Sequence, residues 1–229
     1  MNVLLNTPLF AVAQHMAFDE ACCAAFSGGV WLRFYRWVPG KAVTFGYAQP
    51  FSLVQRAAAA QGFADYVRRP TGGGMVFHAD DLTFSCLFES SLRPGEIYKE
   101  LHGAIQTQLN ALAPVHAWGK TAPQAYAPAR NGAAGACFVN PVENDLLAAD
   151  GHKILGGAIR RFERSVLYQG SLQLPGARQN PALKRAVING VEACFGVRLT
   201  PQAAGQELLA RTEQLVRERY TTPEWNQKF

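Results

Sequence analysis

The stretch Arg68–Ser85, RRPTGGGMVFHADDLTFS, sets two arginines, three consecutive glycines, a histidine and two aspartates between apolar runs. Glycine has no Cβ, so the triplet lets the backbone turn freely and lets another group approach it closely. The flanking runs Met75–Phe77 and Leu82–Leu87 are strand-like, and we predict that they pair around the His-Ala-Asp-Asp turn between them. A glycine loop beside Arg68 and Arg69 favours an anionic ligand, because backbone amides and guanidinium groups both bind negative oxygens. A flexible hairpin tip is the alternative interpretation of the triplet alone.

The common phosphate-binding patterns are absent from the sequence. The chain has neither GxxxxGK[ST] nor a GxGxxG that opens a helix. Neither a Walker loop nor a dinucleotide-binding fingerprint is therefore predicted.

Composition favours one large, intracellular domain. The chain has 229 residues, 48% of them hydrophobic, which is enough for a sizeable core. We predict a single domain over residues 1–229, with a C-terminal helix and tail over residues 198–229 packed on it. The five cysteines form no CxxC pair, which is typical of reduced thiols in a cytosol. No positively charged leader and no run of 18 apolar residues occurs, so we expect a cytoplasmic protein with no membrane segment.

The net charge of +5 comes from 22 basic and 17 acidic residues, and only 17% of the chain is charged. The basic residues are dispersed apart from Arg68–Arg69 and Arg160–Arg161. We therefore expect no nucleic-acid partner, but an acidic protein partner or an anionic substrate.

The sequence pattern predicts an α+β fold in which helices pack on mixed β-sheets, because strands and helices alternate without regular βαβ units. An Asp150–Gly151 turn predicts a tight hairpin, and Asn180–Pro181 with Gly196 predicts the start and end of a helix. The predicted helices are Gln14–Phe26, Ser52–Gly62, one that opens at Pro94, one that opens at Asn180–Pro181, and Pro201–Tyr220. The predicted strands are Val30–Arg36, Ala42–Tyr47, Asp145–Ala149, Lys153–Arg160 and Ser165–Leu174.

A second group of special residues lies in this hairpin, Asn144–Arg161, which reads NDLLAADGHKILGGAIRR. Lys153 stands just before an apolar strand that Gly156–Gly157 interrupts. Two glycines weaken a strand unless a ligand or another backbone lies flat against it. An ammonium beside such a surface can hold a carbonyl or phosphate oxygen as charge develops. The alternative for Lys153 is a solvated charge on a hairpin.

The two groups together resemble a known family. RRPTGGGMVFH, DLTFS, ENDLLAADGHKILGGAIRR and VLYQGSL are similar to motifs of the lipoate–protein ligase A and octanoyltransferase branch of the biotin/lipoate ligase superfamily. The opening HMAFDEA, the strand VTFGYAQ and the ending YTTPEWN extend the resemblance over the whole chain. It implies the mixed-sheet catalytic domain of that superfamily, and an enzyme that attaches a lipoyl or octanoyl group to a lysine of a lipoyl carrier domain.

The resemblance also implies site residues and partners. Lys153 matches the family's essential lysine, which stabilises an oxyanion, and Asp145 orients the adenine or the lysine. The implied partners are lipoyl carrier domains of 2-oxoacid dehydrogenases or the glycine cleavage H protein, together with acyl carrier protein. No metal-binding residue is implied. The residues expected to bind the acyl group or its adenylate are Arg68, Arg69, Thr71, Gly72, Gly73, Gly74, Val76, His78, Asp145, Gly156, Gly157 and Ala158.

Two mechanisms share this scaffold. We expect the first, a lipoate–protein ligase that activates lipoate or octanoate with ATP and Mg²⁺ through an acyl-adenylate, and Gly74, the third glycine, favours it. The alternative is an octanoyltransferase that needs no cofactor and carries the acyl group on Cys137. Cys137 and the run Asp81–Ser85 favour this second mechanism. A third possibility is a protein that binds lipoate or the carrier without catalysis, whereas the loop typical of biotin ligation, GRGRxxR, is missing.

Overall fold

A computed structural model describes residues 1–38, 40–112, 115–117, 141–163 and 165–229. Its main feature is an eight-stranded mixed sheet in the order β11-β1-β2-β6-β10-β9-β8-β7, beside a small sheet in the order β4-β3-β5. The large sheet contains β1 (Asn2–Asn6), β2 (Val30–Phe34), β6 (Leu82–Glu89), β7 (Val115–Ala117), β8 (Leu146–Ala148), β9 (Lys153–Phe162), β10 (Ser165–Leu172) and β11 (Thr200–Ala203). The small sheet contains β3 (Ala42–Phe45), β4 (Tyr66–Arg68) and β5 (Val76–His78).

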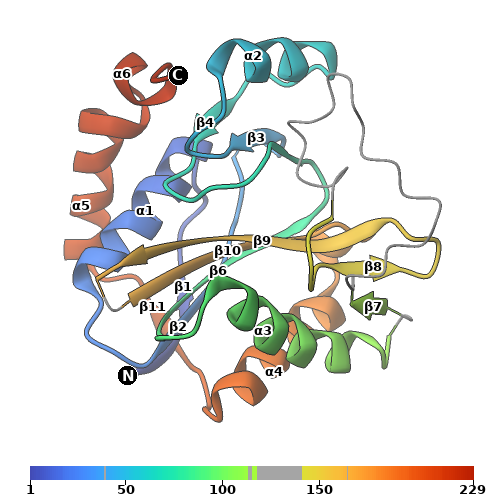
Figure 1. Cartoon of the computed structure of the whole chain (residues 1–229). Helices are drawn as coiled ribbons and strands as arrows, with labels where there is room; N and C mark the ends of the chain where they lie inside the picture. Colours follow the sequence, from blue (N-terminus) through green and yellow to red (C-terminus); the bar gives the residue numbers. More distant parts are fainter. Residues whose placement is uncertain (39, 113–114, 118–140, 164) are drawn as a thin grey trace.

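Helices cover both faces of the large sheet (Figure 1). On one face α3 (Pro94–Leu109) and α4 (Pro181–Phe195) pack on β2, β6 and β10, where they enclose the largest apolar cluster. On the other face lie α1 (Val12–Ala25) and α5 (Gln206–Leu215), which contact each other. The small sheet lies on this second face too, covered by α2 (Phe51–Ala60). This arrangement confirms the predicted α+β class.

The order of the central strands follows from burial. Every residue of β10 is buried, and all but the last of β6, so both strands need cover on two faces. Strand β10 pairs antiparallel with β6 on one side and β9 on the other, whereas β1 pairs parallel with β2 and β11. The sheet is therefore mixed, as predicted.

The locally encoded features agree with the sequence. The Asn180 side chain accepts hydrogen bonds from the backbone N–H groups of Ala182 and Leu183 and so caps α4, whose last turn closes on Gly196 at φ 63°. Gly151 adopts φ 85° in the β8–β9 turn, a backbone conformation that favours glycine. These signals are reliable because capping and tight turns depend on residues next to each other in the chain.

Two predictions about pairing and boundaries were wrong, and one strand was missed. Strands β5 and β6 do not pair with each other: β5 pairs with β3 in the small sheet, and β6 pairs with β2 and β10. The helix predicted over Pro201–Tyr220 begins at Gln206 and not at Pro201, because Thr200–Ala203 forms an edge strand on β1. We had also assigned no strand to Asn2–Asn6. After α5 the chain continues as a π-helical turn, Val216–Tyr220, and a short helix α6, Pro223–Asn226. Among the described residues, no helix is long and apolar enough to cross a membrane.

Candidate active site

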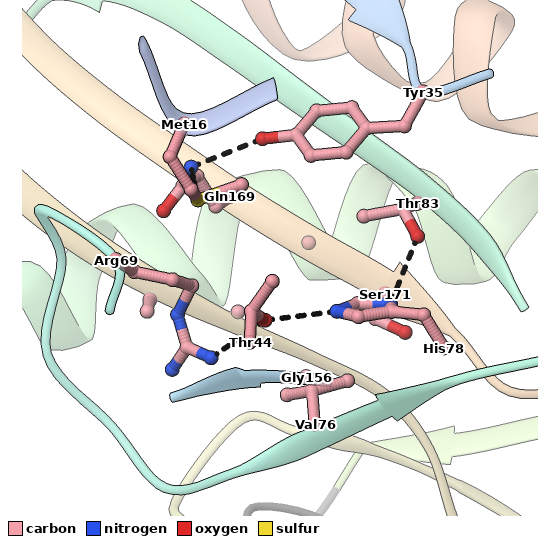
Figure 2. Close-up of a pocket in the computed structure, with 13 residues that line it drawn as sticks. Met16, Tyr35, Thr44, Arg69, Val76, His78, Thr83, Gly156, Gln169 and Ser171 are labelled. Atoms are coloured by element: carbon pink, nitrogen blue, oxygen red, sulfur yellow. Dashed lines mark hydrogen bonds between the residues drawn. The ribbon is translucent and has the colours of Figure 1, made fainter. Parts of the chain in front are cut away.

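A pocket lies between the large sheet and the small sheet (Figure 2). One wall is formed by three cross-strand pairs of β9 and β10, namely Gly156 with Ser171, Gly157 with Gly170, and Ala158 with Gln169. The small sheet and its loops form the opposite wall. The remaining lining residues are Met16, Tyr35, Thr44, Arg69, Val76, His78 and Thr83.

The pocket gathers half of the predicted binding residues. Arg69, Val76 and His78 of the glycine-loop group line it together with Gly156–Ala158 of the hairpin group. The two sequence groups, about 80 residues apart in the chain, therefore meet at one cavity. The pocket residues that sequence reasoning missed are Met16, Tyr35, Thr44, Thr83, Gln169, Gly170 and Ser171. Alternation along the motif VLYQGSL could have placed Gln169 and Ser171 on one face of the strand.

Lys153 is buried and ion-paired. Its Nζ lies 2.8 Å from Oδ2 of Asp145, and both side chains are almost fully shielded from solvent. Burial raises the pKa of Asp145, although the charge of Lys153 opposes this shift. The same carboxylate accepts a hydrogen bond from the Val142 backbone N–H at 2.7 Å. Lys153 is therefore not a solvated hairpin charge.

The two glycines of β9 make room for side chains of the protein itself. A Cβ on Gly156 would lie 2.2 Å from Cε of Lys153, and a Cβ on Gly157 would lie 2.3 Å from the ring of Tyr168. We had attributed the glycines to a ligand or another backbone that lies flat against the strand. They line the pocket, but their close neighbours on the protein are Lys153 and Tyr168.

His102 of α3 supports the turn that carries Asp145. Its Nδ1 lies 2.7 Å from the backbone carbonyl oxygen of Asn144, and its Nε2 lies 2.7 Å from the Tyr168 hydroxyl. Asn144 has φ 71°, an uncommon conformation for a residue with a side chain. Burial, with a smaller effect of the Lys153 charge, lowers the pKa of His102 to about 4. No pattern in the sequence indicated this role, because His102 lies within the apolar pattern of α3.

The two arginines of the glycine-loop group have different surroundings. Arg68 does not line the pocket; its guanidinium donates to the backbone carbonyls of Tyr47, Gln49, Trp225 and Asn226. The prediction that Arg68 binds the ligand is therefore not supported by its position. Successive strand residues point to opposite faces, so only one of two adjacent arginines can face the pocket.

Arg69 does face the pocket, but its guanidinium is engaged with the glycine loop. It donates to the Gly72 and Gly74 carbonyl oxygens at 2.8 Å each and to the Thr44 hydroxyl at 2.9 Å. Gly73 lies against Gly46, since a Cβ added to Gly46 would lie 1.8 Å from the Gly73 carbonyl oxygen. The loop is thus held in a fixed shape and is not a flexible hairpin tip.

A buried polar network closes another side of the pocket. The Gln169 amide nitrogen donates to Asp19 at 2.6 Å and to the Tyr35 hydroxyl at 3.0 Å, and its carbonyl oxygen accepts from Thr71 at 2.6 Å. Asp19 also pairs with the buried Arg33 at 2.7 Å. Thr71, a predicted binding residue, thus acts on the pocket through Gln169.

Cys137, the predicted nucleophile of the transferase mechanism, lies outside the described residues. The four cysteines that the structure describes are free thiols. Burial raises the pKa of Cys86, as we expect for a thiol in the core, and Cys194 is half-buried on α4. Within the described ranges, no group of three or more His, Cys, Asp or Glu residues could hold a metal ion.

Comparison with solved structures shows the fold of this chain in other proteins. Protein Ta0514 of Thermoplasma acidophilum with bound lipoic acid superposes with a TM-score of 0.77 at 20% identity, covering 100% of this chain and 98% of that one. A lipoate-protein ligase A bound with ATP gives a TM-score of 0.76 at 21% identity, with 99% of each chain covered.

Relatives found by sequence have a higher identity to this chain than these solved structures. An octanoyltransferase LipM of Symbiobacterium thermophilum is 34% identical over 180 residues, which span 75% of this chain and 64% of that protein. One from Brevibacillus brevis is 29% identical, with 96% of both chains covered. Residues 11–188 match the model of the lipoyl protein ligase A/B catalytic domain. As the resemblance of its motifs predicted, the chain belongs to the lipoyl protein ligase A/B catalytic domain family.

Proposed function

We propose that this protein transfers an octanoyl group from acyl carrier protein to a lysine of a lipoyl carrier domain in the cytoplasm. The observation that carries the proposal is the buried Lys153, which pairs with Asp145 and lies against Gly156, a residue that lines the pocket. Such an ammonium can stabilise a thiolate or the oxyanion that forms on an acyl carbonyl. The relatives named octanoyltransferase support this choice of acyl group and of a transfer reaction.

The proposed reaction has two steps, with Cys137 as the nucleophile. In the first, the Cys137 thiolate attacks the thioester carbonyl of the donor, and the carrier thiol leaves with a proton, so that the octanoyl group forms a thioester with Cys137. In the second, the neutral amine of the target lysine attacks this thioester, the Cys137 thiolate leaves, and the nitrogen loses a proton as the amide forms. Lys153 stabilises the negative oxygen in both steps.

The surroundings of Arg68 and Arg69 support the transferase over the ligase. A ligase would need cationic groups for the phosphates of ATP and of the acyl-adenylate. Both guanidinium groups instead donate to backbone carbonyls of the protein. The glycine triplet, with Gly74 in third position, favours the ligase, which would use ATP and Mg²⁺ and would place Lys153 beside a phosphate oxygen.

The carrier domain is proposed on chemical grounds. The chain has a net charge of +5, which favours an acidic partner by electrostatic steering. A bi-partite lipoate protein ligase of Thermoplasma acidophilum, studied together with its E2 lipoyl domain, has this fold, with a TM-score of 0.73. We therefore propose a lipoyl domain of a 2-oxoacid dehydrogenase, or the glycine cleavage H protein, as the acceptor.

Cysteine and lysine variants test the mechanism. Cys137→Ala should abolish octanoyl transfer from acyl carrier protein to an apo lipoyl domain, and Lys153→Ala should reduce it severely. Cys194→Ala is the matched control, because it removes a half-buried thiol on α4 that does not line the pocket. This variant should leave transfer intact. If Cys137→Ala retained full activity with lipoate and ATP, the ligase mechanism would replace the one proposed.

A further inference from the structure

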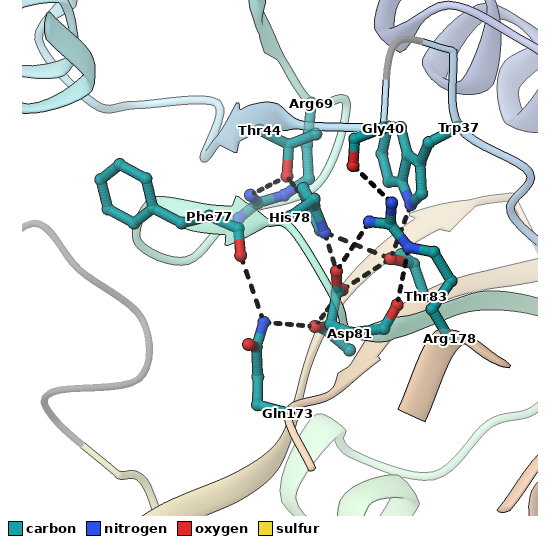
Figure 3. A network of polar contacts seen from close by, with 11 residues as sticks. Trp37, Gly40, Thr44, Arg69, Phe77, His78, Asp81, Thr83, Gln173 and Arg178 are labelled. Atoms are coloured by element: carbon teal, nitrogen blue, oxygen red, sulfur yellow. Dashed lines mark hydrogen bonds and ion pairs between the residues drawn. The ribbon is translucent and has the colours of Figure 1, made fainter. Parts of the chain in front are cut away.

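A chain of buried hydrogen bonds runs from the large sheet to the glycine loop (Figure 3). It starts at Asp81, passes through His78 and Thr44, and ends at Arg69, which contacts the loop carbonyls. Asp81, at the start, does not line the pocket, whereas the three other residues do. The chain therefore connects a group behind the pocket, through Arg69 at the pocket wall, with the glycine loop.

The Asp81 carboxylate is fixed by the large sheet. Its Oδ2 accepts from the hydroxyls of Thr83 on β6 and Ser171 on β10, each at 2.6 Å, and lies 2.8 Å from Nδ1 of His78. Its Oδ1 lies 3.5 Å from the Arg178 guanidinium. Burial would raise the pKa of Asp81, but His78 and the two hydroxyls lower it to about 2. Asp81 is thus an ionised acceptor held in one orientation.

The remaining bonds follow from an ionised Asp81. It accepts the hydrogen on Nδ1 of His78, and the opposite ring nitrogen, Nε2, lies 2.8 Å from the Thr44 hydroxyl, with which it shares a hydrogen bond. The Thr44 oxygen in turn accepts from Nη1 of Arg69 at 2.9 Å. Trp37 stacks on the His78 ring with centroids 4.6 Å apart and holds the ring plane.

Arg69 connects this series of hydrogen bonds to the glycine loop. Its Nη2 donates to the carbonyls of Gly72 and Gly74, which flank Gly73 at φ 86°. That backbone conformation favours glycine, and the two bonds fix the Gly72–Gly73 and Gly74–Met75 peptide groups. A peptide group is planar, so fixing these carbonyls also fixes the directions of the adjoining N–H groups.

We propose that His78 is a positioning residue, which, anchored by Asp81, orients Thr44 and Arg69 so that the glycine loop is held ready for the acyl group. We had expected His78 to bind the ligand. Both of its ring nitrogens are instead engaged within the protein, and its effect on the ligand passes through Arg69. The identity of the ligand as an acyl chain rests on the proposed function, whereas the ordering of the loop does not.

Hydrogen–deuterium exchange of the loop amides, together with calorimetric binding of octanoate, tests the proposal. Thr44→Val removes the hydroxyl at nearly constant shape, and Asp81→Asn removes the charge from outside the pocket. Each should speed exchange over residues 72–75 about tenfold and weaken octanoate binding to a similar degree, which corresponds to about 1.4 kcal/mol. Thr44→Ser keeps the hydroxyl and should retain the native rate of exchange over residues 72–75.

A control and a double variant separate positioning from general destabilisation. Thr212→Val removes another buried threonine hydroxyl, which donates to the Leu208 carbonyl at 2.7 Å on α5, and should lower Tm without changing loop exchange. Because the residues act in series, Thr44→Val combined with Asp81→Asn should cost no more than the larger single effect. Additive effects, or native loop exchange in Thr44→Val, would overturn the proposal. A native protein that binds no acyl ligand would instead contradict the proposed function, and the exchange data would still decide whether His78 positions the loop.

Discussion

Gly156→Ala should inactivate the enzyme while the fold persists. The new Cβ would lie 2.2 Å from Cε and 2.4 Å from Nζ of Lys153, so the end of the lysine must retreat by about 1 Å to reach ordinary contact distance. The obstructed atoms are the end of a flexible side chain, which can move without displacing the strand. The movement also stretches the 2.8 Å contact between Lys153 and Asp145.

The expected magnitude follows from this displacement. A misplacement of about 1 Å at a reacting centre can reduce the rate about 100-fold, which corresponds to about 2.7 kcal/mol of transition-state stabilisation. The strain on folding should be smaller, about 1–2 kcal/mol. We therefore expect kcat for octanoyl transfer to fall about 100-fold, with a Tm reduced by only a few degrees.

The assay compares Gly156→Ala with Gly103→Ala. Gly103 lies within α3, and a Cβ there would meet no atom within 4 Å, so alanine should stabilise that helix by up to about 1 kcal/mol and leave transfer unchanged. Transfer is followed by the mass of the lipoyl domain and stability by calorimetry. Native kcat in a folded Gly156→Ala variant would refute the argument that the position of Lys153 determines activity.

Three further predictions concern stability. Folding lowers the pKa of His102 from 6.5 to about 4, so the stability that its neutral form contributes above pH 6.5 is lost as the pH falls towards 4. The free energy of unfolding should fall by about 3 kcal/mol over this range. Urea unfolding of His102→Gln should lack this part of the pH dependence. Arg68→Met should reduce the free energy of unfolding by about 3 kcal/mol, since carbonyls that include those of Trp225 and Asn226 lose their donor; thermal unfolding with unchanged Tm would contradict this. Gly190→Ala would place a Cβ 2.7 Å from Cα of Ile105, so α3 and α4 must separate and urea unfolding should show a loss of about 1–3 kcal/mol.

Local signals in the sequence predicted local structure well. The Asp150–Gly151 turn and the ends of α4 depend on neighbouring residues, and both formed as predicted. Strand pairing depends on distant segments, and for that reason the partner of β5 could not be deduced from the adjacent β6. The edge strand Thr200–Ala203 was also missed, because its pairing with β1 spans almost the whole chain.

The site residues divide in the same way, into those that local sequence motifs identify and those that only the fold brings together. Motifs identified Lys153 and the two glycine groups, because unusual residue types at close spacing are visible in the sequence. Their partners were not visible: His102 lies in an ordinary apolar helix pattern, and Gln169 in a buried strand. The separate surroundings of Arg68 and Arg69 follow from strand alternation, but only the fold shows which of the two faces the pocket.

A comparison of acyl donors separates octanoyl transfer from ATP-dependent ligation. The protein is incubated with an apo lipoyl domain and either octanoyl acyl carrier protein or lipoate with ATP and Mg²⁺, and the intact masses of both proteins are followed. We predict that the lipoyl domain gains an octanoyl group from acyl carrier protein without ATP, and that the enzyme passes through an octanoylated form that Cys137→Ala cannot make. Modification that occurs only with lipoate and ATP, or with neither donor, would contradict this prediction.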